Sequence, residues 1–477
     1  MATAGSDDGG AVVLGIDVAT ADVRALCVDG AGRVLARASA PLPAPIRSAG
    51  GRSEQDAGRW WPAAAEAART ALVALPGGGA RVRSLAVAAT SGTVALVDAD
   101  RRPIGPALLY DDRRAARLTA AAYSAAVDRF AGLGLQGSGI GAIGRIAWLV
   151  REHGAAASGR RARVCHTGDL IGWHLTGSPV PTDWNSALKS GFDAQRLEWV
   201  VSALQAAGVP EAVLPEVLAP GTLVGVVGAA AAEETGLPRT CEVRLGTTDG
   251  CAGQLASGAV APGDFVGVLG TTYVLKGVSR KLVVDPSGAL YSHRHPNGWW
   301  LPGGASNTGG EALARWPRGG LQALDRAAAA RGPSSIVSYP LQRDGERFPF
   351  TAPDARGFEI GESQDDVDRY RAALEGVAFL ERLALERVQA LGIAFEPPLT
   401  AAGGGNRSDA WLRIRATVLG AAVRVVDSAE TAFGAALLAA TGSLYDDLAA
   451  ATAAMVPPGR LVQPVVGEVA RLEESYG

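Results

Sequence analysis

The sequence predicts an α/β protein with two domains of similar size, and three observations support this prediction. The chain has 477 residues, more than the roughly 250 to 300 at which a single hydrophobic core stops growing. One strand-and-turn pattern occurs twice, at residues 11–40 and 263–287. In the first half of the chain, strand, helix and strand patterns follow one another, which is typical of layered α/β folds.

The first copy of the repeated pattern, residues 11–40, begins with an apolar strand and bends at a turn that holds Asp17 and Thr20. A second strand follows, then a turn with Gly30 and Gly32, then a third strand. The pattern therefore predicts a β-meander.

The second copy, residues 263–287, bends at Gly270, Thr271 and Thr272. Small residues let backbone N–H groups approach a phosphate, and threonine hydroxyls can donate further hydrogen bonds. Two such hairpins could hold one polyphosphate from both sides. Duplicated β-meanders also occur in proteins that bind no nucleotide, so the pattern alone leaves both interpretations open.

The segments after the first copy predict helices and strands in alternation. Residues 59–75 are rich in strong helix formers and stop before Pro76. Residues 82–89 predict a buried strand that leads into Ser91 and its neighbours. Charged residues at 111–114 follow the next apolar strand; they could line a cleft, although the start of a solvated helix would look the same.

Further along, residues 113–129, 143–153 and 165–176 predict helical segments, and 182–193 predicts a polar loop that carries side chains inward. Residues 245–253 then form a loop of glycine and threonine after a strand, and this loop contains one carboxylate, Asp249. A lone loop carboxylate is more often a turn residue than a catalyst. Its position alone therefore leaves a catalytic role open.

Two glycine-rich segments lie in the second half. Residues 299–316 predict a loop that opens a helix, and 399–420 predict a strand, three glycines, a cap at Ser408 and a helix ended by Gly420. Such loops suit nucleotides because they present unpaired N–H groups at a positive helix end. Neither has the spacing of a Walker A or a GxGxxG motif, so P-loop and Rossmann folds are disfavoured.

Composition excludes several classes of partner. The net charge is −3, so there is no overall basic field for nucleic acid or an anionic membrane. The four cysteines lack metal-ligand spacing, which argues against zinc and disulfide scaffolds and favours a reduced cytoplasm. No uninterrupted apolar run is long enough to span a bilayer. Residues 1–10 lack the layout of a signal peptide and predict a disordered tail.

Ten short segments, taken in order, resemble the FGGY family of carbohydrate kinases. Any one of them could arise by chance, whereas ten in the right order are highly specific. They are GIDVATADVR at 15–24, SEQDAGRWW at 53–61, the segment 89–115 that ends in LLYDDRRA, TDWNSALKSGFD at 182–193, GTTDG at 246–250, GTT at 270–272, PGGASNTGG at 302–310, GERFPF at 345–350, RAALEGVAF at 371–379 and AAGGGNRSDAWL at 401–412.

The resemblance implies two RNase H-like domains of the actin, hexokinase and Hsp70 type with a cleft between them. The sugar-binding lobe would span 11–252 and the ATP-binding lobe 253–477. Members of the family transfer the γ-phosphoryl group of ATP to a sugar hydroxyl. The implied partners are therefore ATP, Mg²⁺ and a small sugar, and a homodimer is possible.

The resemblance also implies roles for individual residues. Asp249 matches the catalytic acid that accepts the proton of the attacking hydroxyl, and Asp17 matches the residue near Mg²⁺, which it would hold through water. The residues implied in ATP binding are Thr20, Arg24, Thr271, Thr272, Gly309, Gly310, Gly404 and Gly405.

For the sugar, the segments look like the subgroup from cyanobacteria and plants, called xylulose kinase-like, that acts on D-ribulose. A histidine that contacts the sugar in common bacterial xylulose kinases is missing at 91–93. The resemblance thus favours D-ribulose first and D-xylulose second. The expected sugar ligands are Ser91, Asp112, Asn185 and Asp249; Trp184 is a weaker candidate because a core role is more common for tryptophan.

The first loop departs from the family pattern at two positions. Ala19 stands where a glycine is usual, and it would be strained if the site required a positive φ. Asp22 adds negative charge where phosphates should bind, although Arg24 could offset it. These departures leave open a catalytically weak sugar-binding or regulatory protein. An actin-like or chaperone-like ATPase is a third alternative.

Overall fold

The computed structural model describes residues 10–158, 161–426 and 429–477, and the chain divides into two compact units. The first unit consists of Met1–Gly258, His293–Gly298 and Glu430–Val456; the second consists of Ala259–Ser292, Trp299–Ala429 and Pro457–Gly477. The units therefore interleave along the sequence. The predicted domain boundary between residues 252 and 253 stays a prediction, and the predicted tail lies outside the described residues apart from Gly10.

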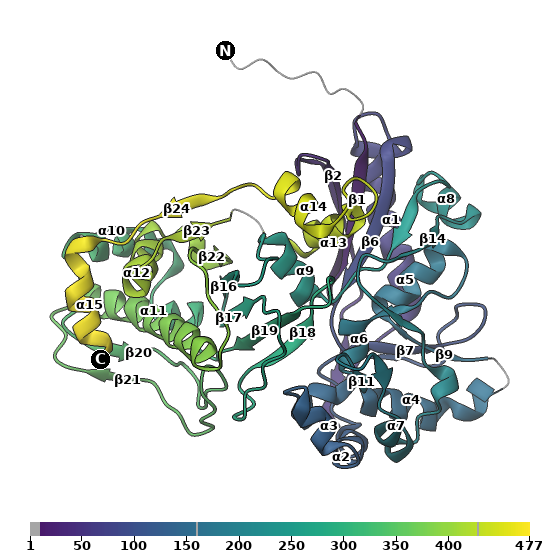
Figure 1. Cartoon of the computed structure of the whole chain (residues 1–477), viewed down its shortest axis with the longest axis horizontal. Helices are drawn as coiled ribbons and strands as arrows, with labels where there is room; N and C mark the ends of the chain where they lie inside the picture. Colours follow the sequence, from purple (N-terminus) through teal and green to yellow (C-terminus); the bar gives the residue numbers. More distant parts are fainter. Residues whose placement is uncertain (1–9, 159–160, 427–428) are drawn as a thin grey trace. The chain divides into compact units, whose positions relative to one another are not determined.

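The first unit is built on a mixed six-stranded sheet (Figure 1). The predicted meander is confirmed, because its first three strands are antiparallel neighbours. Strands β1, β6 and β15 run parallel to one another at the centre. In spatial order the strands are β14 (Leu223–Val226), β15 (Glu242–Arg244), β6 (Val82–Ala89), β1 (Val12–Val18), β2 (Asp22–Asp29) and β3 (Val34–Pro41).

Helices cover both faces of this sheet, so β1 is buried along its whole length. The predicted helix at 59–75 is confirmed as α1 (Trp60–Ala74), which packs on β2 and β3. On the opposite face lies α13 (Thr431–Ala440), which packs on β1 and on α9 (Asp249–Ala256). This helix lies so close to β1 that a Cβ at Gly15 would come 1.8 Å from the carbonyl oxygen of Ala432. Glycine is therefore required there by packing.

A second, five-stranded sheet completes the first unit, together with two strand pairs. Its strands are β4 (Ile46–Ser48), β5 (Arg52–Gln55), β8 (Ala107–Leu108), β7 (Val94–Val97) and β9 (Arg163–His166). The paired strands are β10 (Thr182–Asp183) with β13 (Val217–Leu218), and β11 (Phe192–Asp193) with β12 (Glu198–Trp199). The other helices are α2 (Ala116–Ser124), α3 (Val127–Gly132), α4 (Gly141–Ser158), α5 (Thr167–Thr176), α6 (Trp184–Leu188), α7 (Val201–Ala207), α8 (Ala229–Thr235) and α14 (Leu448–Met455).

The segment 182–193 differs from the predicted polar loop. It contains the short helix α6, and the Asp183 side chain caps this helix by accepting hydrogen bonds from the N–H groups of Asn185 and Ser186. A side chain that accepts from free N–H groups replaces the missing intrahelical bonds of the first turn. Trp184 and Asn185 are buried, as expected for inward-facing side chains.

The second unit contains most of a mixed seven-stranded sheet whose centre is the second hairpin, β16 and β17; the first-unit residues His293 and Arg294 end its edge strand. Its strands, in spatial order, are β18 (Tyr291–Arg294), β19 (Trp300–Ala305), β17 (Tyr273–Gly277), β16 (Phe265–Leu269), β22 (Leu399–Ala402), β23 (Val423–Val425) and β24 (Arg460–Val462). A small pair, β20 (Val337–Tyr339) and β21 (Phe358–Ile360), lies apart from it. The helices are α10 (Leu321–Arg331), α11 (Asp366–Ala390), α12 (Asp409–Leu419) and α15 (Val469–Tyr476).

Capping fixes the bounds of α12 as the sequence predicts. The Ser408 hydroxyl accepts from the N–H of Trp411, and Gly420 ends the helix with φ of 61°. The other glycine-rich segment, predicted to open a helix, forms strand β19 and only a 3₁₀ turn, Gly310–Leu313.

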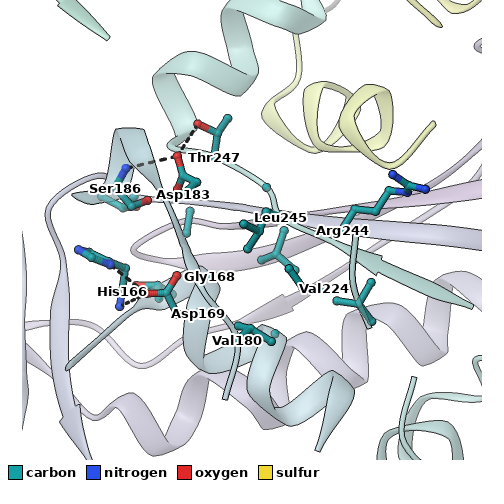
Figure 2. A pocket seen from close by; sticks show the side chains of 17 residues that line it. His166, Gly168, Asp169, Val180, Asp183, Ser186, Val224, Arg244, Leu245 and Thr247 are labelled. Carbon is teal, nitrogen blue, oxygen red and sulfur yellow. Dashed lines mark hydrogen bonds and ion pairs between the residues drawn. The ribbon is translucent and has the colours of Figure 1, made fainter. Parts of the chain in front are cut away.

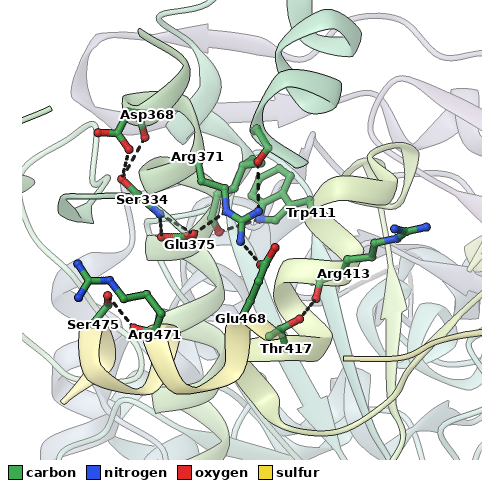
Figure 3. Close-up of polar contacts among 12 residues, drawn as sticks. Ser334, Asp368, Arg371, Glu375, Trp411, Arg413, Thr417, Glu468, Arg471 and Ser475 are labelled. Carbon is green, nitrogen blue, oxygen red and sulfur yellow. Dashed lines mark hydrogen bonds and ion pairs between the residues drawn. The ribbon is translucent and has the colours of Figure 1, made fainter. Parts of the chain in front are cut away.

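A buried ion-pair network ties the C-terminal helix to α11 (Figure 3). Arg371, 2% exposed, forms ion pairs with Glu375 on its own helix and with Glu468, just before α15. Leu472 of α15 is also buried. Among the helices of the described residues, none is long and apolar enough to cross a bilayer.

Candidate functional site

The carboxyl ends of three parallel strands of the first unit meet at one sheet edge. In the order β15, β6, β1 these strands are neighbours, and they lead into Asp249, Ser91 and the Asp17 turn respectively. A backbone bridge between Ala89 and Thr248 continues the pairing beyond the strands. In open α/β sheets, ligands bind outside the carboxyl ends of the strands. The structure thus brings these three predicted residues to the edge where a ligand is expected.

Asp17 is a buried carboxylate with an unsatisfied oxygen. Its residue is 3% exposed, and Oδ1 accepts no hydrogen bond from the described residues. The other oxygen lies 3.7 Å from the guanidinium of Arg24, which is opposite Asp17 on β2. Burial raises the pKa of Asp17 to about 6; Arg24 works against this, while the charges of Asp249 and Asp22 add to it. The carboxylate is therefore held at a cost that a bound cation would offset.

The turn between β1 and β2 has no backbone strain at Ala19. Among the described residues, the non-glycine positions with positive φ are Arg101, Arg161 and Leu197. The Ala19 N–H donates to the Asp22 carbonyl, whereas the N–H groups of Thr20 and Ala21 donate to no described residue. The turn therefore leaves donors available for an anion.

Arg24 and Asp22 form an ion pair beside this turn. The Arg24 guanidinium lies 3.0 Å from Asp22 Oδ1, and the Arg24 side chain is 53% exposed. An exposed pair of this kind contributes little to stability. Its main consequence is that Arg24 is shared between two carboxylates, Asp22 and Asp17.

Ser91 lies in the turn between β6 and β7. The hydroxyl oxygens of Ser91 and Thr93 are buried and have no hydrogen-bond partner among the described residues. Gly92 adopts φ of 80°, and its carbonyl accepts from Nε of Arg145. Arg145 is itself buried and also donates to the Asp112 carbonyl, so it holds two loops in place. Burial lowers the pKa of Arg145 to about 10.

The carboxylate of Asp112 is committed to protein groups. It accepts from the Ser53 N–H and from the Arg114 N–H and guanidinium. Its side chain is fully buried, and Arg114 also pairs with Glu54. The structure therefore places Asp112 in a buried ion-pair network next to the Ser91 loop.

Asp249 is the first residue of α9 and is partly buried. Thr248 precedes it as the N-cap residue, yet its buried hydroxyl makes no capping bond and has no hydrogen-bond partner within the described ranges. An acidic group at a helix N-terminus interacts favourably with the helix dipole. Asp249 is also close enough to Asp17 for its charge to raise the Asp17 pKa.

Asn185 is fully buried and fully engaged. Its amide nitrogen donates to Thr247 Oγ1 and to the carbonyl of Arg294, and its oxygen accepts from the Arg294 N–H. Thr247 in turn donates to Asp183, as Figure 2 shows. A cavity of about 30 Å³ is lined by Asp183, Thr247 and His166, among others.

In the second unit, the exposed Thr271 and the half-buried Thr272 lie in the turn of the hairpin of β16 and β17. Their N–H groups donate to no described residue. Gly309 and Gly310 pack directly against this turn: a Cβ at Gly309 would come 2.4 Å from the carbonyl carbon of Thr272, and Gly310 donates its N–H to Gly270. The structure thus brings the hairpin and the first glycine pair together.

The second glycine pair adjoins the same hairpin through Leu269, the last residue of β16. A Cβ at Gly405 would come 2.5 Å from the Leu269 side chain. Gly404 begins the 3₁₀ turn that leads into α12. All four predicted glycines of the second unit therefore border one hairpin.

Three residues of the first-unit site were not predicted as functional: Asp183, Thr247 and Arg145. Thr247 adjoins Thr248 and Asp249 in the GTTDG segment, which is the only signal in the sequence that could have drawn attention to it. The roles of Asp183 and Arg145 depend on partners that are far away in the sequence.

Known proteins resemble this chain over most of its length. The sequence matches the FGGY family of carbohydrate kinases, N-terminal domain, over residues 12–256, and the C-terminal domain of that family over residues 263–443. A xylulose kinase from Streptomyces rubiginosus is 31% identical over 448 residues, covering 90% of this chain and 88% of that protein. An autoinducer-2 kinase from Klebsiella pneumoniae subsp. pneumoniae is 28% identical and covers 92% of this chain and 87% of its own length.

Among solved structures, the xylulose kinase from Rhodospirillum rubrum matches with a TM-score of 0.82 at 26% identity, over 98% of this chain and 96% of that chain. The predicted two-domain α/β fold of sugar kinases is therefore confirmed. Two domain matches in the right order, and relatives that align over nearly the whole chain, lead to one conclusion: the protein belongs to the FGGY family of carbohydrate kinases and is a sugar kinase.

Proposed function

We propose that this sugar kinase transfers the γ-phosphoryl group of ATP to a hydroxyl of a ketopentose, with D-ribulose as its preferred acceptor. The observation that carries the proposal is a group of buried oxygen atoms at one sheet edge that have no hydrogen-bond partner among the residues the structure describes. Buried polar groups without hydrogen bonds are rare and costly, so a polyhydroxylated ligand is the natural partner. The four atoms are Asp17 Oδ1, Ser91 Oγ, Thr93 Oγ1 and Thr248 Oγ1.

In the proposed reaction, Asp249 orients the attacking sugar hydroxyl and accepts its proton. As the new O–P bond forms, the bond between the γ-phosphorus and its bridging oxygen breaks and ADP leaves. The transition state is loose, so the protein contributes mainly positioning and charge stabilisation. Asp249 is the first residue of α9, directly after the Ala89–Thr248 bridge, so the helix and the sheet edge together fix where its carboxylate starts.

The donor set at the edge fits Mg²⁺. This ion is usually bound through one or two carboxylates, its own waters and substrate phosphates. Asp17 offers one unpartnered oxygen, and three or more metal-ligating side chains do not converge anywhere in the described ranges. Asp17 would hold the ion through water, and the ion would neutralise charge on the transferred phosphoryl group.

For ATP, we propose that the two hairpin turns bind phosphates through their free N–H groups. In the first turn these belong to Thr20 and its neighbour, with Arg24 alongside; in the second they belong to Thr271 and Thr272. Successive N–H groups in a turn form an anion-binding concavity. The four glycines that border the second hairpin, Gly309, Gly310, Gly404 and Gly405, would let the adenosine approach the backbone.

The preference for D-ribulose rests on the Ser91 loop. It presents two small hydroxyl side chains around Gly92, where a Cβ would already come 3.1 Å from Arg145. Ser91 and Asp249 are the proposed sugar ligands. Asp112 and Asn185 were also expected as ligands, but their polar atoms are occupied by protein groups, so we propose that they support the sugar ligands and do not contact the sugar.

D-xylulose is the second candidate, since several relatives of this chain are xylulose kinases. A coupled ADP-release assay with D-ribulose, D-xylulose, L-ribulose and glycerol distinguishes the candidates. The expected result is the highest kcat/KM with D-ribulose. A higher value with D-xylulose would support the second candidate, and activity confined to glycerol would refute both.

A catalytically weak sugar-binding or regulatory role has one structural observation in its favour, the ion pair of Asp22 with Arg24 beside the first turn. Calorimetry separates the two roles. A kinase binds both sugar and MgATP, and loses turnover on Asp249→Ala; a regulator binds sugar without tight MgATP binding. We also propose a homodimer, which sedimentation of the purified protein tests directly.

A further inference from the structure

We propose that Asp183, Asn185 and Thr247 form a positioning cluster that sets the location of Asp249, and that Asn185 acts through Thr247 rather than on the sugar. This inference rests on the proposed role of Asp249. All three residues belong to the first unit, and each is at most 5% exposed.

The Thr247 hydroxyl is the centre of the cluster. It donates to Asp183 Oδ1 over 3.1 Å and accepts from Asn185 Nδ2 over 3.1 Å. Both its donor and one acceptor position are therefore used. A buried hydroxyl held from two sides has one rotamer and one location, so the backbone of Thr247 is fixed with it.

Backbone hydrogen bonds connect the position of Thr247 to that of Asp249. The Thr247 carbonyl accepts from the Ala89 N–H at the end of β6, and the Thr248 carbonyl accepts from the N–H groups of Cys251 and Ala252 in the first turn of α9. Only Thr248 separates Thr247 from Asp249. A shift of the Thr247 hydroxyl therefore moves the start of α9 and the carboxylate on it.

Asp183 joins the cluster to helix α6. Its Oδ1 accepts from Thr247 and from the N–H groups of Asn185 and Ser186, the latter two at the first turn of the helix. One oxygen atom thus sets both the start of α6 and the turn before Asp249, as the dashed lines in Figure 2 show for Thr247 and Ser186.

Asn185 has no polar group left for a sugar. The Arg294 backbone determines the orientation of its amide, because the Arg294 N–H can only donate, over 2.7 Å, and the Arg294 carbonyl can only accept, over 2.9 Å. The remaining N–H of the amide goes to Thr247. With both donors used, the oxygen engaged and the residue 0% exposed, Asn185 is a positioning residue.

The test compares Thr247→Val, Asn185→Ala and the double variant in the full-length protein, with steady-state kinetics on the best ketopentose. Thr247→Val keeps the shape of the side chain and removes its hydrogen bonds. A displacement of about 1 Å at a catalytic group costs on the order of 100-fold in rate. The expected result is a fall in kcat of roughly 10- to 100-fold for each single variant, with the KM of the sugar changed less than about threefold, and a double variant little worse than either.

A conservative variant, a control variant and hydrogen exchange distinguish a loss of positioning from poor folding. Thr247→Ser restores the hydroxyl and should recover most of kcat, and Asn297→Ala, an exposed asparagine in the same unit, serves as the matched control. Hydrogen exchange of the Cys251 and Ala252 amides should be faster in both Thr247→Val and Asn185→Ala.

Two results would overturn the proposal: unchanged exchange at the start of α9 in both variants, or a loss confined to the KM of the sugar in Asn185→Ala, which would indicate direct sugar contact. Hydrogen exchange needs no turnover. If the wild-type protein phosphorylates no ketopentose, the proposed function fails, while the exchange result still decides whether the cluster positions α9.

Discussion

The two hairpins of this kinase share a backbone design and differ in charge. In both, a tight turn exposes N–H groups that no described residue accepts from. The first turn is surrounded by Asp17, Asp22 and Arg24, whereas the second, Gly270 to Thr272, carries no charge. The two turns therefore offer an anion the same kind of backbone donors, and the first also places carboxylates and a guanidinium beside them.

The hairpins also differ in the contacts that hold their turns in place. The second is fixed by close packing, because Gly309 and Gly405 allow other loops to touch its backbone and Leu269. The first is held by hydrogen bonds to its backbone, from Gln55 Nε2 to the Thr20 carbonyl and from the Leu42 N–H to the Ala21 carbonyl, while its charged partner Arg24 is half exposed and shared between two carboxylates. We therefore expect substitutions near the second hairpin to act through sterics and those near the first to act through charge and pH.

The largest loss of activity is expected on substitution of Asp249, the proposed base, which lies near Asp17 of the first hairpin. Asp249→Asn removes the proton acceptor beside Asp17 and should lower kcat by about 10² to 10⁴. The KM values of sugar and ATP should change little, because the variant keeps the size of the side chain. Steady-state ADP release measures this; kcat within fivefold of the wild type would show that Asp249 is not the base.

The next effect tests the packing of the second hairpin. Gly309→Ala places a Cβ 2.4 to 2.6 Å from backbone atoms of Thr272 and Tyr273, which must then move. The expected result is a rise of roughly 10- to 100-fold in the KM of ATP, given the cost of a misplacement of about 1 Å. Sugar affinity measured by calorimetry should stay the same.

The matched control is Gly319→Ala, since a Cβ at Gly319 meets nothing within 4 Å. Equal effects of the two alanines on the KM of ATP would contradict the steric explanation.

A third prediction concerns the loss of folding stability caused by the buried Asp17 carboxylate of the first hairpin. The pKa of Asp17 is raised to about 6 from 3.8, so the folded state binds the proton more tightly than the unfolded chain. Ionised Asp17 therefore destabilises the ligand-free protein at pH 8, and this penalty disappears as the pH falls below about 4. Asp17→Asn should raise the free energy of unfolding by about 1–3 kcal/mol at pH 8.

Denaturant titration of the ligand-free protein at several pH values checks this prediction. The benefit of Asp17→Asn should be nearly constant between pH 8 and about pH 7, and should then shrink as the pH falls through the Asp17 pKa of about 6 towards pH 4. A benefit that does not change over this range would mean that the Asp17 carboxylate is not destabilised by burial.

The smallest effect is expected at the exposed end of the first hairpin. Asp22→Asn removes a negative charge near the proposed phosphates and frees Arg24 from one partner. Exposed ion pairs contribute about 0–1 kcal/mol, so the KM of ATP should fall about two- to fivefold at low ionic strength. Added salt should remove the difference. A higher KM would mean that Asp22 assists binding.

Sequence patterns predicted the local structure well where local rules govern it. The meander, α1, β6 and the capped helix α12 follow from apolar spacing, helix formers and end signals that lie within each segment. The polar segment 182–193 was predicted wrongly as a loop, because the helix there depends on a short-range cap by Asp183 that the pattern did not reveal.

Segments that resemble a family also predicted the enzyme class, and the order of strands at one sheet edge agrees with the grouping of Asp17, Ser91 and Asp249. The sequence segments do not show which polar side chains remain free to bind a ligand. Asp112 and Asn185 look as suitable as Ser91 in the sequence, yet both are used up by partners that are 59 and 109 residues away, Ser53 and Arg294.

By itself, then, the sequence determined the α/β elements, the two hairpins and the family, since these depend on periodicity, turn residues and short motifs. Only the tertiary structure decided that Glu430–Val456 packs in the first unit, that Ala19 is unstrained, and which buried oxygen atoms lack partners. The physical reason is that burial and hydrogen-bond satisfaction are set by contacts between distant segments, and no local pattern encodes them.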